Sequence, residues 1–237
     1  MKSRQEIKLI ARQQMARQRG TAILLGILVS LIGFVSGVID QVVSLVFGGF
    51  SPIYWVVYLV GYAVILVASV NMVGEYIKIY QGETASAANV FNNMSVNFMR
   101  KLGGTMWMSL WIVLWTMLFI IPGIIKAMSY YFTQNILADC PNVTARQALK
   151  ISMKITHGYK MDIFVFILSF LGWHLLGLFT CGILNLVFVT PYQATADGGL
   201  YLTLRDRALE EGIITYEELG MDSPEATVSE SDLGFTN

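Results

Sequence analysis

Long runs of hydrophobic residues, separated by short polar segments, dominate this chain. One run of 24 residues, 102–125, contains no charged side chain. As a helix it would extend about 36 Å, more than the roughly 30 Å hydrocarbon core of a bilayer. Comparable runs lie on both sides of it. The pattern predicts an all-α polytopic membrane protein with about six transmembrane helices, near residues 21–39, 53–73, 104–121, 124–138, 163–180 and 183–204.

The fourth of these segments, residues 124–138, is short for a span and follows a helix break expected at Pro122-Gly123. Two interpretations remain open for it: a short span or a re-entrant arm. We favour the span, because the long side chain of Lys126, near one helix end, can extend its ammonium group to the membrane interface.

Three polar segments between the apolar runs keep helical spacing of their hydrophobic residues, which is typical of interfacial helices. They are residues 1–20, residues 76–101 and a helix that begins at the capping box Thr144-Ala-Arg-Gln147. Basic residues on such helices bind anionic membrane surfaces, each contributing about 1 kcal/mol. We therefore expect lipid-surface binding by Arg4, Lys8, Arg12, Arg146, Lys150 and Lys154.

Composition and charge support a membrane location. Hydrophobic residues make up 55% of the chain, charged residues only 14%, and the mean hydropathy is +0.58. Soluble domains carry about a quarter charged residues. With the N-terminus inside, 15 of the 16 Lys and Arg residues fall on the cytoplasmic side and Lys126 alone lies outside. This asymmetry predicts a multi-pass protein of a bacterial cytoplasmic membrane with both termini in the cytoplasm.

The last segment of the chain differs from the rest, because eight acidic residues and no basic residue follow Arg207. We expect residues 208–237 to form an acidic, largely disordered cytoplasmic tail. Residues 1–20 would form a basic amphipathic N-terminal helix, and residues 21–207 the six-span membrane domain.

Polar side chains at membrane depth are the default candidates for function, because burying them without a partner costs several kcal/mol. The candidates are Lys126, His174, Asn185 and Asp197, and His174 and Asn185 lie where they could pair across the last hairpin. Structural roles are the simpler interpretation for each. The topology separates the two histidines of the chain across the bilayer, which argues against a metal site.

The sequence contains no Gly-rich phosphate loop and no nucleophile motif, so we expect no cofactor and no enzymatic activity. Cys140 and Cys181 are predicted to be free thiols on opposite sides of the membrane. Small residues in the last span, such as Gly198 and Gly199, would permit close helix approach and a homo- or hetero-oligomer. The basic stripes lie beside membrane spans, which favours membrane lipids of the anionic inner leaflet over nucleic acid as partners.

Several short motifs identify a family resemblance. They are Pro-Gly-x-x-Lys at 122–126, Leu-Ala-Asp-x-Pro at 137–141, Ala-Leu-x-x-Ser at 148–152, Leu-Ser-Phe-x-Gly-Trp at 168–173 and Pro-Tyr at 191–192. Together they resemble an uncharacterised integral membrane family of Gram-positive bacteria, the domain-of-unknown-function family nine hundred seventy-five. The motifs are also distantly similar to the membrane domain of glycerophosphodiester phosphodiesterases. The resemblance implies a multi-span bacterial membrane protein and supplies no substrate and no catalytic residue.

Two functions fit these features. The first is a non-enzymatic envelope scaffold or partner-binding protein, whose basic helices hold the anionic inner leaflet. The alternative is a small transporter or channel for a lipid, a peptide or a small solute. That alternative requires a polar cavity lined by Asp197, Asn185 or His174.

Overall fold

The structure, a computed structural model, describes residues 2–49, 51–180 and 182–221, and within these ranges it is helical and contains no strand. The elements are α1 (Arg4–Arg17), α2 (Arg19–Phe47), α3 (Pro52–Gln81), α4 (Ala87–Asn92), α5 (Phe98–Leu118), α6 (Ile120–Ser129), α7 (Thr133–Asp139), α8 (Ala145–Thr156), α9 (Lys160–Leu168), α10 (Leu171–Phe179), the π-helix η1 (Asn185–Val189) and α11 (Thr190–Glu210).

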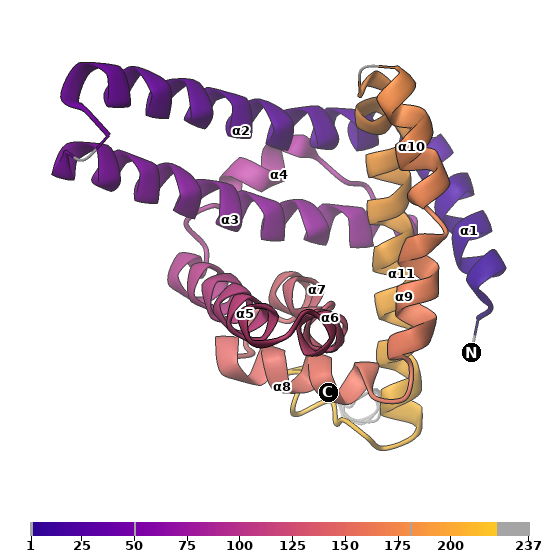
Figure 1. Ribbon diagram of the computed structural model, residues 1–237. Helices are drawn as coiled ribbons and strands as arrows, with labels where there is room; N and C mark the ends of the chain where they lie inside the picture. The colour runs from indigo at the N-terminus through magenta and orange to yellow at the C-terminus, as the bar shows by residue number, and fades with distance from the viewer. Residues whose placement is uncertain (1, 50, 181, 222–237) are drawn as a thin grey trace, which may run out of the picture.

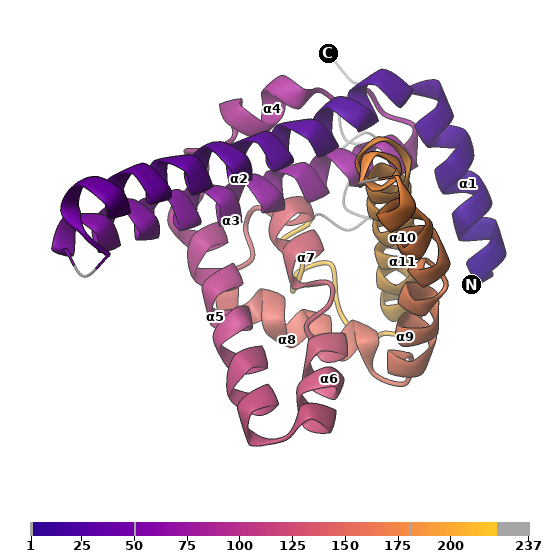
Figure 2. The same ribbon diagram turned by 45° about the horizontal axis from the view of Figure 1, so that its top comes forward.

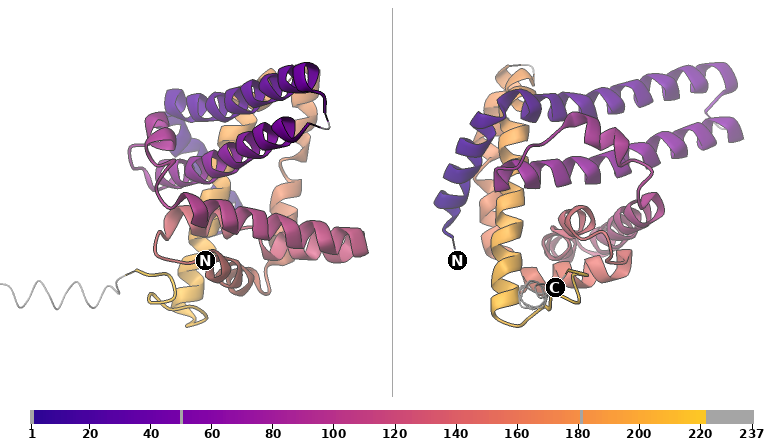
Figure 3. Two further views of the ribbon diagram at one scale, coloured as in Figure 1. Left: turned by 90° about the vertical axis from the view of Figure 1, so that its left-hand side faces the viewer. Right: turned by 180° about the vertical axis from the view of Figure 1, so that it is seen from behind.

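Three helical hairpins project from a common junction (Figures 1 and 2). They are α2 with α3, α5 with α6, and α9–α10 with η1–α11. The junction, which we call the base, comprises α1, α4, α7 and α8 together with the adjoining ends of α3, α5 and α11. In Figure 1, α2 and α3 run across the view and α9 to α11 run up it, whereas Figure 3 shows α5 and α6 projecting in a third direction. The hairpins therefore do not form one parallel bundle.

The prediction of six spans is only partly met. Among the described residues, three helices are long and apolar enough to cross a membrane: α2, α3 and the continuous stretch of α9 and α10. α5 has 21 residues, but its first turn contains Arg100 and Lys101. The predicted fourth span is divided between α6 and α7, and the predicted sixth consists of η1 and the more polar α11. The coarse class, all-α with long apolar helices, is correct, and fewer helices meet the length and hydropathy of a span than expected.

The break expected at Pro122-Gly123 lies three residues earlier. Phe119 adopts an extended conformation (φ −155°, ψ 138°) and separates α5 from α6. Pro122 lies in the first turn of α6, where a missing N–H breaks no helical hydrogen bond. Gly123 allows the two helices to approach closely, because a Cβ there would lie 2.3 Å from Oγ1 of Thr116.

The hydrophobic core occupies the base. Ile7 and Ala11 of α1 are completely buried, and α1 packs on α3 and α11. α8 buries Ala148, Ile151 and Ile155 against the neighbouring helices. The apolar faces of both amphipathic helices are thus directed into the protein. The predicted interfacial helix over residues 76–101 is instead the end of α3, the short α4 and the start of α5.

Unlike the base, which buries its hydrophobic residues, the hairpins have large hydrophobic side chains on their outer surfaces. Leu45 is 89% exposed, Met117 is 84% exposed and Phe179 is 87% exposed, and each lies near the tip of a different hairpin. Soluble monomers rarely expose apolar patches of such extent. The outer surfaces of the hairpins therefore fit an apolar environment, whereas the base holds its hydrophobic residues inside.

The segment after α11 is ordered as far as the structure describes it, to residue 221. Ile214 and Leu219 are buried (2% and 0% exposed). Glu218 accepts hydrogen bonds from Nζ of Lys154 on α8 at 2.6 and 2.9 Å. The first part of the predicted acidic tail thus packs on the base, and residues 222–237 lie outside the described residues.

The small-residue face of α11 packs against α3 of the same chain. A Cβ on Gly198 would lie 3.3 Å from Cα of Ile77, and a Cβ on Gly199 would lie 2.1 Å from the ring of Tyr80. Substituting Gly199→Ala should lower the free energy of unfolding by about 1–3 kcal/mol, because the rigid ring has to move. Thermal unfolding in detergent, followed by circular dichroism, measures this loss.

Gly103→Ala is the matched control, because no atom lies within 4 Å of the added methyl group. Alanine is favoured over glycine inside a helix by about 0.5–1 kcal/mol, so this variant should be as stable as the wild type or more stable. Equal stability of the two variants would contradict the close packing of α11 on α3.

Candidate functional site: a polar cleft at the base

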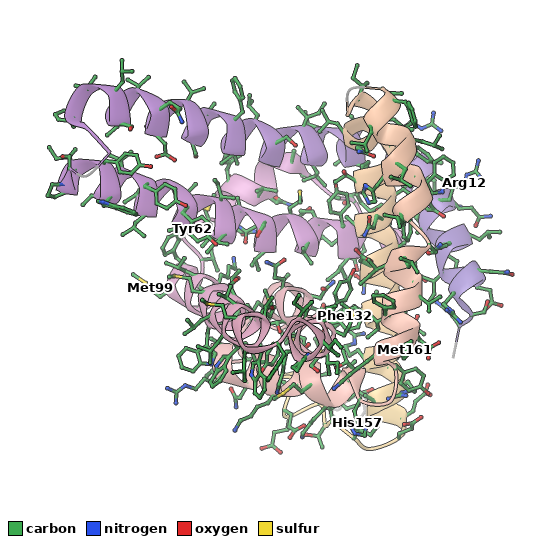
Figure 4. All side chains as sticks on the ribbon, viewed as in Figure 1. Arg12, Tyr62, Met99, Phe132, His157 and Met161 are labelled. Carbon is green, nitrogen blue, oxygen red and sulfur yellow. The ribbon has the colours of Figure 1, made fainter. Side chains whose placement is uncertain are left out.

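A cleft of about 450 Å³ opens between α3, the segment from α4 to α5, and α7. Its wall is unusually polar for the interior of a protein with this composition. Figure 4 shows the side chains that extend from α3, α5 and α7 in this part of the protein. The polar and charged residues used below are Asn71, Glu75, Lys78, Glu83, Asn93, Arg100, Lys101 and Asp139.

Glu75 on α3 is 2% exposed and has every partner a buried carboxylate needs. Its oxygens accept hydrogen bonds from the backbone N–H of Ser86 at 2.9 Å and from Nδ2 of Asn89 at 3.3 Å. Nζ of Lys78, one helical turn further along α3, forms an ion pair with it at 2.7 Å. Glu75 therefore fixes α4 against the end of α3.

Lys101 on α5 is 7% exposed, and its ammonium group has only neutral partners. Nζ donates to Oδ1 of Asn71 at 2.6 Å and to the backbone carbonyl of Asn93 at 3.1 Å. Burial and the adjacent Arg100 lower the pKa of Lys101, since both disfavour its charged form. Asn71 in turn donates to the carbonyl of Val90 at 2.9 Å, so Lys101 connects α3 with α4.

Arg100 binds the C-terminal end of α7. Its guanidinium donates to the carbonyls of Leu137 at 2.6 Å, Val143 at 2.8 Å and Cys140 at 2.9 Å. The last carbonyls of a helix lack intrahelical donors and carry partial negative charge, so a cation is favourable there. Burial lowers the pKa of Arg100, which nevertheless stays charged in water near neutral pH.

A second arginine reaches the same helix end from α11. Nη1 of Arg205 lies 2.7 Å from Oδ2 of Asp139, the last residue of α7, and the hydroxyl of Tyr201 donates to the same oxygen at 2.8 Å. Asp206 accepts from Arg205 at 2.8 Å. The end of α7 is therefore held by charged groups from both α5 and α11.

The predicted intramembrane polar residues do not gather in this cleft. Lys126 lies over the rings of Trp115 and Tyr130, with its Nζ 5.4 and 5.7 Å from their centroids. His174 is hydrogen-bonded to Oε1 of Gln193 at 2.7 Å. The sequence allowed a pairing of His174 with Asn185, and in the structure its hydrogen-bond partner is this glutamine on α11.

Asn185 and Asp197 occupy tight, separate positions. A Cβ on Gly177 would lie 2.1 Å from Oδ1 of Asn185, so this amide packs directly on the α10 backbone. Asp197 faces the hydroxyl of Tyr131, and its Oδ1 is buried without a hydrogen-bond partner among the described residues. The transporter alternative requires a polar cavity lined by Asp197, Asn185 or His174, and none of these three residues lines the cleft described here.

Of the three basic residues of α1 that were predicted to bind the lipid surface, two contact other side chains of the protein and one is exposed. Arg4 lies 3.5 Å from Asp162, and Nζ of Lys8 lies 4.4 Å from the centroid of the Phe170 ring. Arg12 is exposed on the outer side of α1 (Figure 4).

On α8, the three basic residues form the exposed stripe that the sequence predicts, and the capping box of Thr144 and Gln147 is present. Arg146 lies over the ring of Trp107 at 5.9 Å, and Lys154 forms the ion pair with Glu218.

Sequence reasoning identified Lys78, Arg100 and Lys101 only as cytoplasmic charges and missed the cleft. One local signal was present: Asn71, Glu75 and Lys78 recur at helical spacing and share one face of α3. The partners on α4, α5 and α7 are distant in sequence and carry no such signal. No three His, Cys, Asp or Glu side chains gather as metal ligands within the described ranges, and the expected lack of a metal stays a prediction.

Over the residues that the structure describes, the protein is helical, has three helices of membrane-spanning length and has a polar cleft where the hairpins join. The chain belongs to the DUF975 family, described as a protein of unknown function, whose family model matches residues 46–208. This range begins at the end of α2 and ends within α11, so it includes the whole cleft. Comparisons with curated proteins and with solved structures gave no match.

The buried thiol next to the cleft provides a test of this geometry. Cys140 is fully buried beside Asp139, and burial together with that carboxylate raises the pKa of its thiol from 9.0 to about 12. At pH 9 only about a thousandth of Cys140 would be thiolate in the folded protein, against half in the unfolded chain. This thiol therefore stabilises the fold below pH 9, and the contribution is lost as the pH rises towards 12.

In a Cys181→Ser background, a maleimide should label native Cys140 very slowly at pH 7 to 9, and rapidly after denaturation. Labelling is measured by mass spectrometry over time. Native labelling at the rate of the denatured chain would contradict the packing of α7 on α11.

Proposed function

We propose that this protein is a non-enzymatic membrane scaffold or partner-binding protein whose base rests on an anionic inner leaflet. The observation that carries the proposal is the separation of two surfaces. Large hydrophobic side chains cover the outside of the hairpins, whereas α8 presents Arg146, Lys150 and Lys154 on a helix whose apolar face is already buried. The hairpins supply hydrophobic insertion, and the base supplies charge.

The charge distribution supports an orientation with the base in the cytoplasm and a multi-pass chain with both termini there. The base contains α1, α8 and the start of α5, to which most of the basic residues belong. The tip of the hairpin of α2 and α3 carries an aromatic cluster instead, in which the rings of Tyr54, Trp55, Tyr58 and Tyr62 contact one another. Aromatic residues concentrate at membrane interfaces, and basic residues concentrate on the cytoplasmic side. In this orientation α5 and α11, with 21 residues each, are long enough for further passes. α6 has ten residues and would extend only about 15 Å, which fits the re-entrant arm better than a full span.

Because the apolar face of α8 is inside the protein, its contact with lipid would be electrostatic. Each basic residue near an anionic surface contributes about 1 kcal/mol, so three residues give roughly 3 kcal/mol. This is enough to enrich anionic lipids around α8 and too little to anchor the protein without the hairpins.

Neutralising the stripe in Arg146→Gln/Lys150→Gln/Lys154→Gln should reduce the anionic lipid that copurifies with the protein. A headgroup that contacts one basic residue loses about 1 kcal/mol, which is a factor of about five. The ratio of phosphatidylglycerol to phosphatidylethanolamine in mildly purified protein should therefore fall several-fold. Lipid mass spectrometry measures the ratio.

The matched control, Arg146→Lys/Lys150→Arg/Lys154→Arg, keeps all three charges and should retain the wild-type ratio. The proposal fails if the neutral variant retains the same lipids as this control.

The ion pair between Lys154 and Glu218 allows a second test, because it competes with lipid headgroups for the ammonium group of Lys154. Both side chains are 42% exposed, so the pair adds little stability. Substituting Glu218→Gln frees Lys154 for lipid headgroups and should raise the retained phosphatidylglycerol above that of the wild type. Glu217→Gln, which removes the neighbouring charge without breaking a recorded ion pair, should have the smaller effect. An equal effect of the two variants would show that only the net charge of the tail matters.

A solute-binding or transport role is the second candidate, and the polar cleft is the observation that favours it. Buried charges beside a cavity are unusual in a protein this apolar. The cleft lies at the base, however, and His174, Asn185 and Asp197 lie elsewhere. The scaffold therefore remains the leading proposal, with a ligand site in its cytoplasmic part.

A further inference from the structure

Two neighbouring cations on α5 lack a carboxylate partner. Among the described residues, no Asp or Glu oxygen lies within 4.0 Å of the charged nitrogens of Arg100 or Lys101. Their hydrogen-bond partners are backbone carbonyls and the amide of Asn71. A buried ammonium group with neutral partners keeps much of its desolvation penalty, which amounts to several kcal/mol per ion in proteins.

The carboxylates that line the cleft are already engaged or exposed. Glu75 is paired with Lys78, and Asp139 is paired with Arg205. Glu83 lies at the exposed end of the wall. Among the described lining residues, Arg100 and Lys101 are thus two cations without an ion pair, against one exposed carboxylate, Glu83.

Both cations also retain unused donors. An ammonium group has three N–H donors, and Lys101 uses two of them. Nη2 of Arg100 has two N–H donors and uses one of them, for the carbonyl of Leu137. The side chain of Asn93 lines the same cleft. Buried donors without partners are rare in native structures and call for an occupant.

We propose that this cleft binds a phosphate group, held by Lys101 and Arg100. An oxyanion offers acceptors to several donors at once, and charge-assisted hydrogen bonds to phosphate are among the strongest in proteins. The volume of about 450 Å³ falls within the roughly 300–1,000 Å³ of small-molecule sites, which leaves room for an organic group attached to the phosphate. The phosphate can belong to a soluble phosphomonoester or to the headgroup of an anionic lipid.

The test uses the full-length protein in detergent, with inorganic phosphate and glycerol 3-phosphate as probes at constant ionic strength. Ligands that bind only the folded state raise the unfolding temperature. Both probes should raise it for the wild type, and sodium chloride at the same ionic strength should not. Lys101→Met should lose the shift, with affinity at least about tenfold weaker. Its melting temperature without ligand should change little, because removing a buried charge without a counter-ion offsets the loss of the hydrogen bonds to Asn71 and Asn93.

Three further variants separate binding from folding. Lys101→Arg keeps the charge and should retain the phosphate shift. Asn93→Asp adds a carboxylate to the cleft, which should abolish the phosphate shift without lowering stability, since it gives Lys101 a counter-ion. Lys150→Met, on the exposed stripe of α8, should behave as the wild type.

The source of the phosphate is decided by a lipid arm. In nanodiscs, we measure whether phosphatidylglycerol competes with glycerol 3-phosphate for the site. Competition identifies a lipid headgroup as the occupant, and a lack of competition identifies a soluble phosphate compound. Both results support the site. The proposal would be overturned by equal phosphate shifts of the unfolding temperature in the wild type, Lys101→Met and Asn93→Asp. It would also be overturned if neither inorganic phosphate nor glycerol 3-phosphate shifted the unfolding temperature and phosphatidylglycerol did not bind. The α8 triple variant should still bind phosphate, so failure of the leaflet proposal and failure of this one give different results.

Discussion

The base depends on the hydrogen bonds that Arg100 donates to the last carbonyls of α7. They join the start of the second hairpin to a seven-residue helix that also contacts α3 and α8. A helix of this length has no stability of its own in water, so its end groups must be satisfied by neighbours. Arg100 supplies donors to the carbonyls, and Arg205 neutralises Asp139 at the same end. Without these two arginines, three hairpins would share a junction with unpaired backbone groups.

This junction explains why polar groups are buried in so apolar a chain. The hairpins have hydrophobic outer surfaces, and their paired helices approach closely at small residues, as at Gly123 against Thr116. At the base the helices cross in different directions, and ridges of apolar side chains cannot fill every space between them. Hydrogen-bonded charges such as Glu75 fill that space and also fix one geometry, since their partners stand at defined positions.

Local patterns in the sequence predicted the helical class, the capping box of α8, its basic stripe and the family. Each of these depends on residues within a few positions of one another. The turn at Phe119 was missed, because the presence of Pro122-Gly123 points to a break there, whereas proline is equally at home in the first turn of a helix. The cleft was missed because Arg100 meets carbonyls about forty residues away, and periodicity carries no information about such contacts.

The burial of the apolar faces of α1 and α8 changes what their basic residues can do. An amphipathic helix that inserts its apolar face binds lipid through both area and charge. Here that area is used by the core, through Ile7 and Ile155 among others, and only charge faces outward. Charge acts over about 10 Å at moderate ionic strength and weakens as salt rises. Hydrophobic insertion by the hairpins and lipid selection by the base are therefore separate properties of this fold, and salt would affect the second while leaving the first intact.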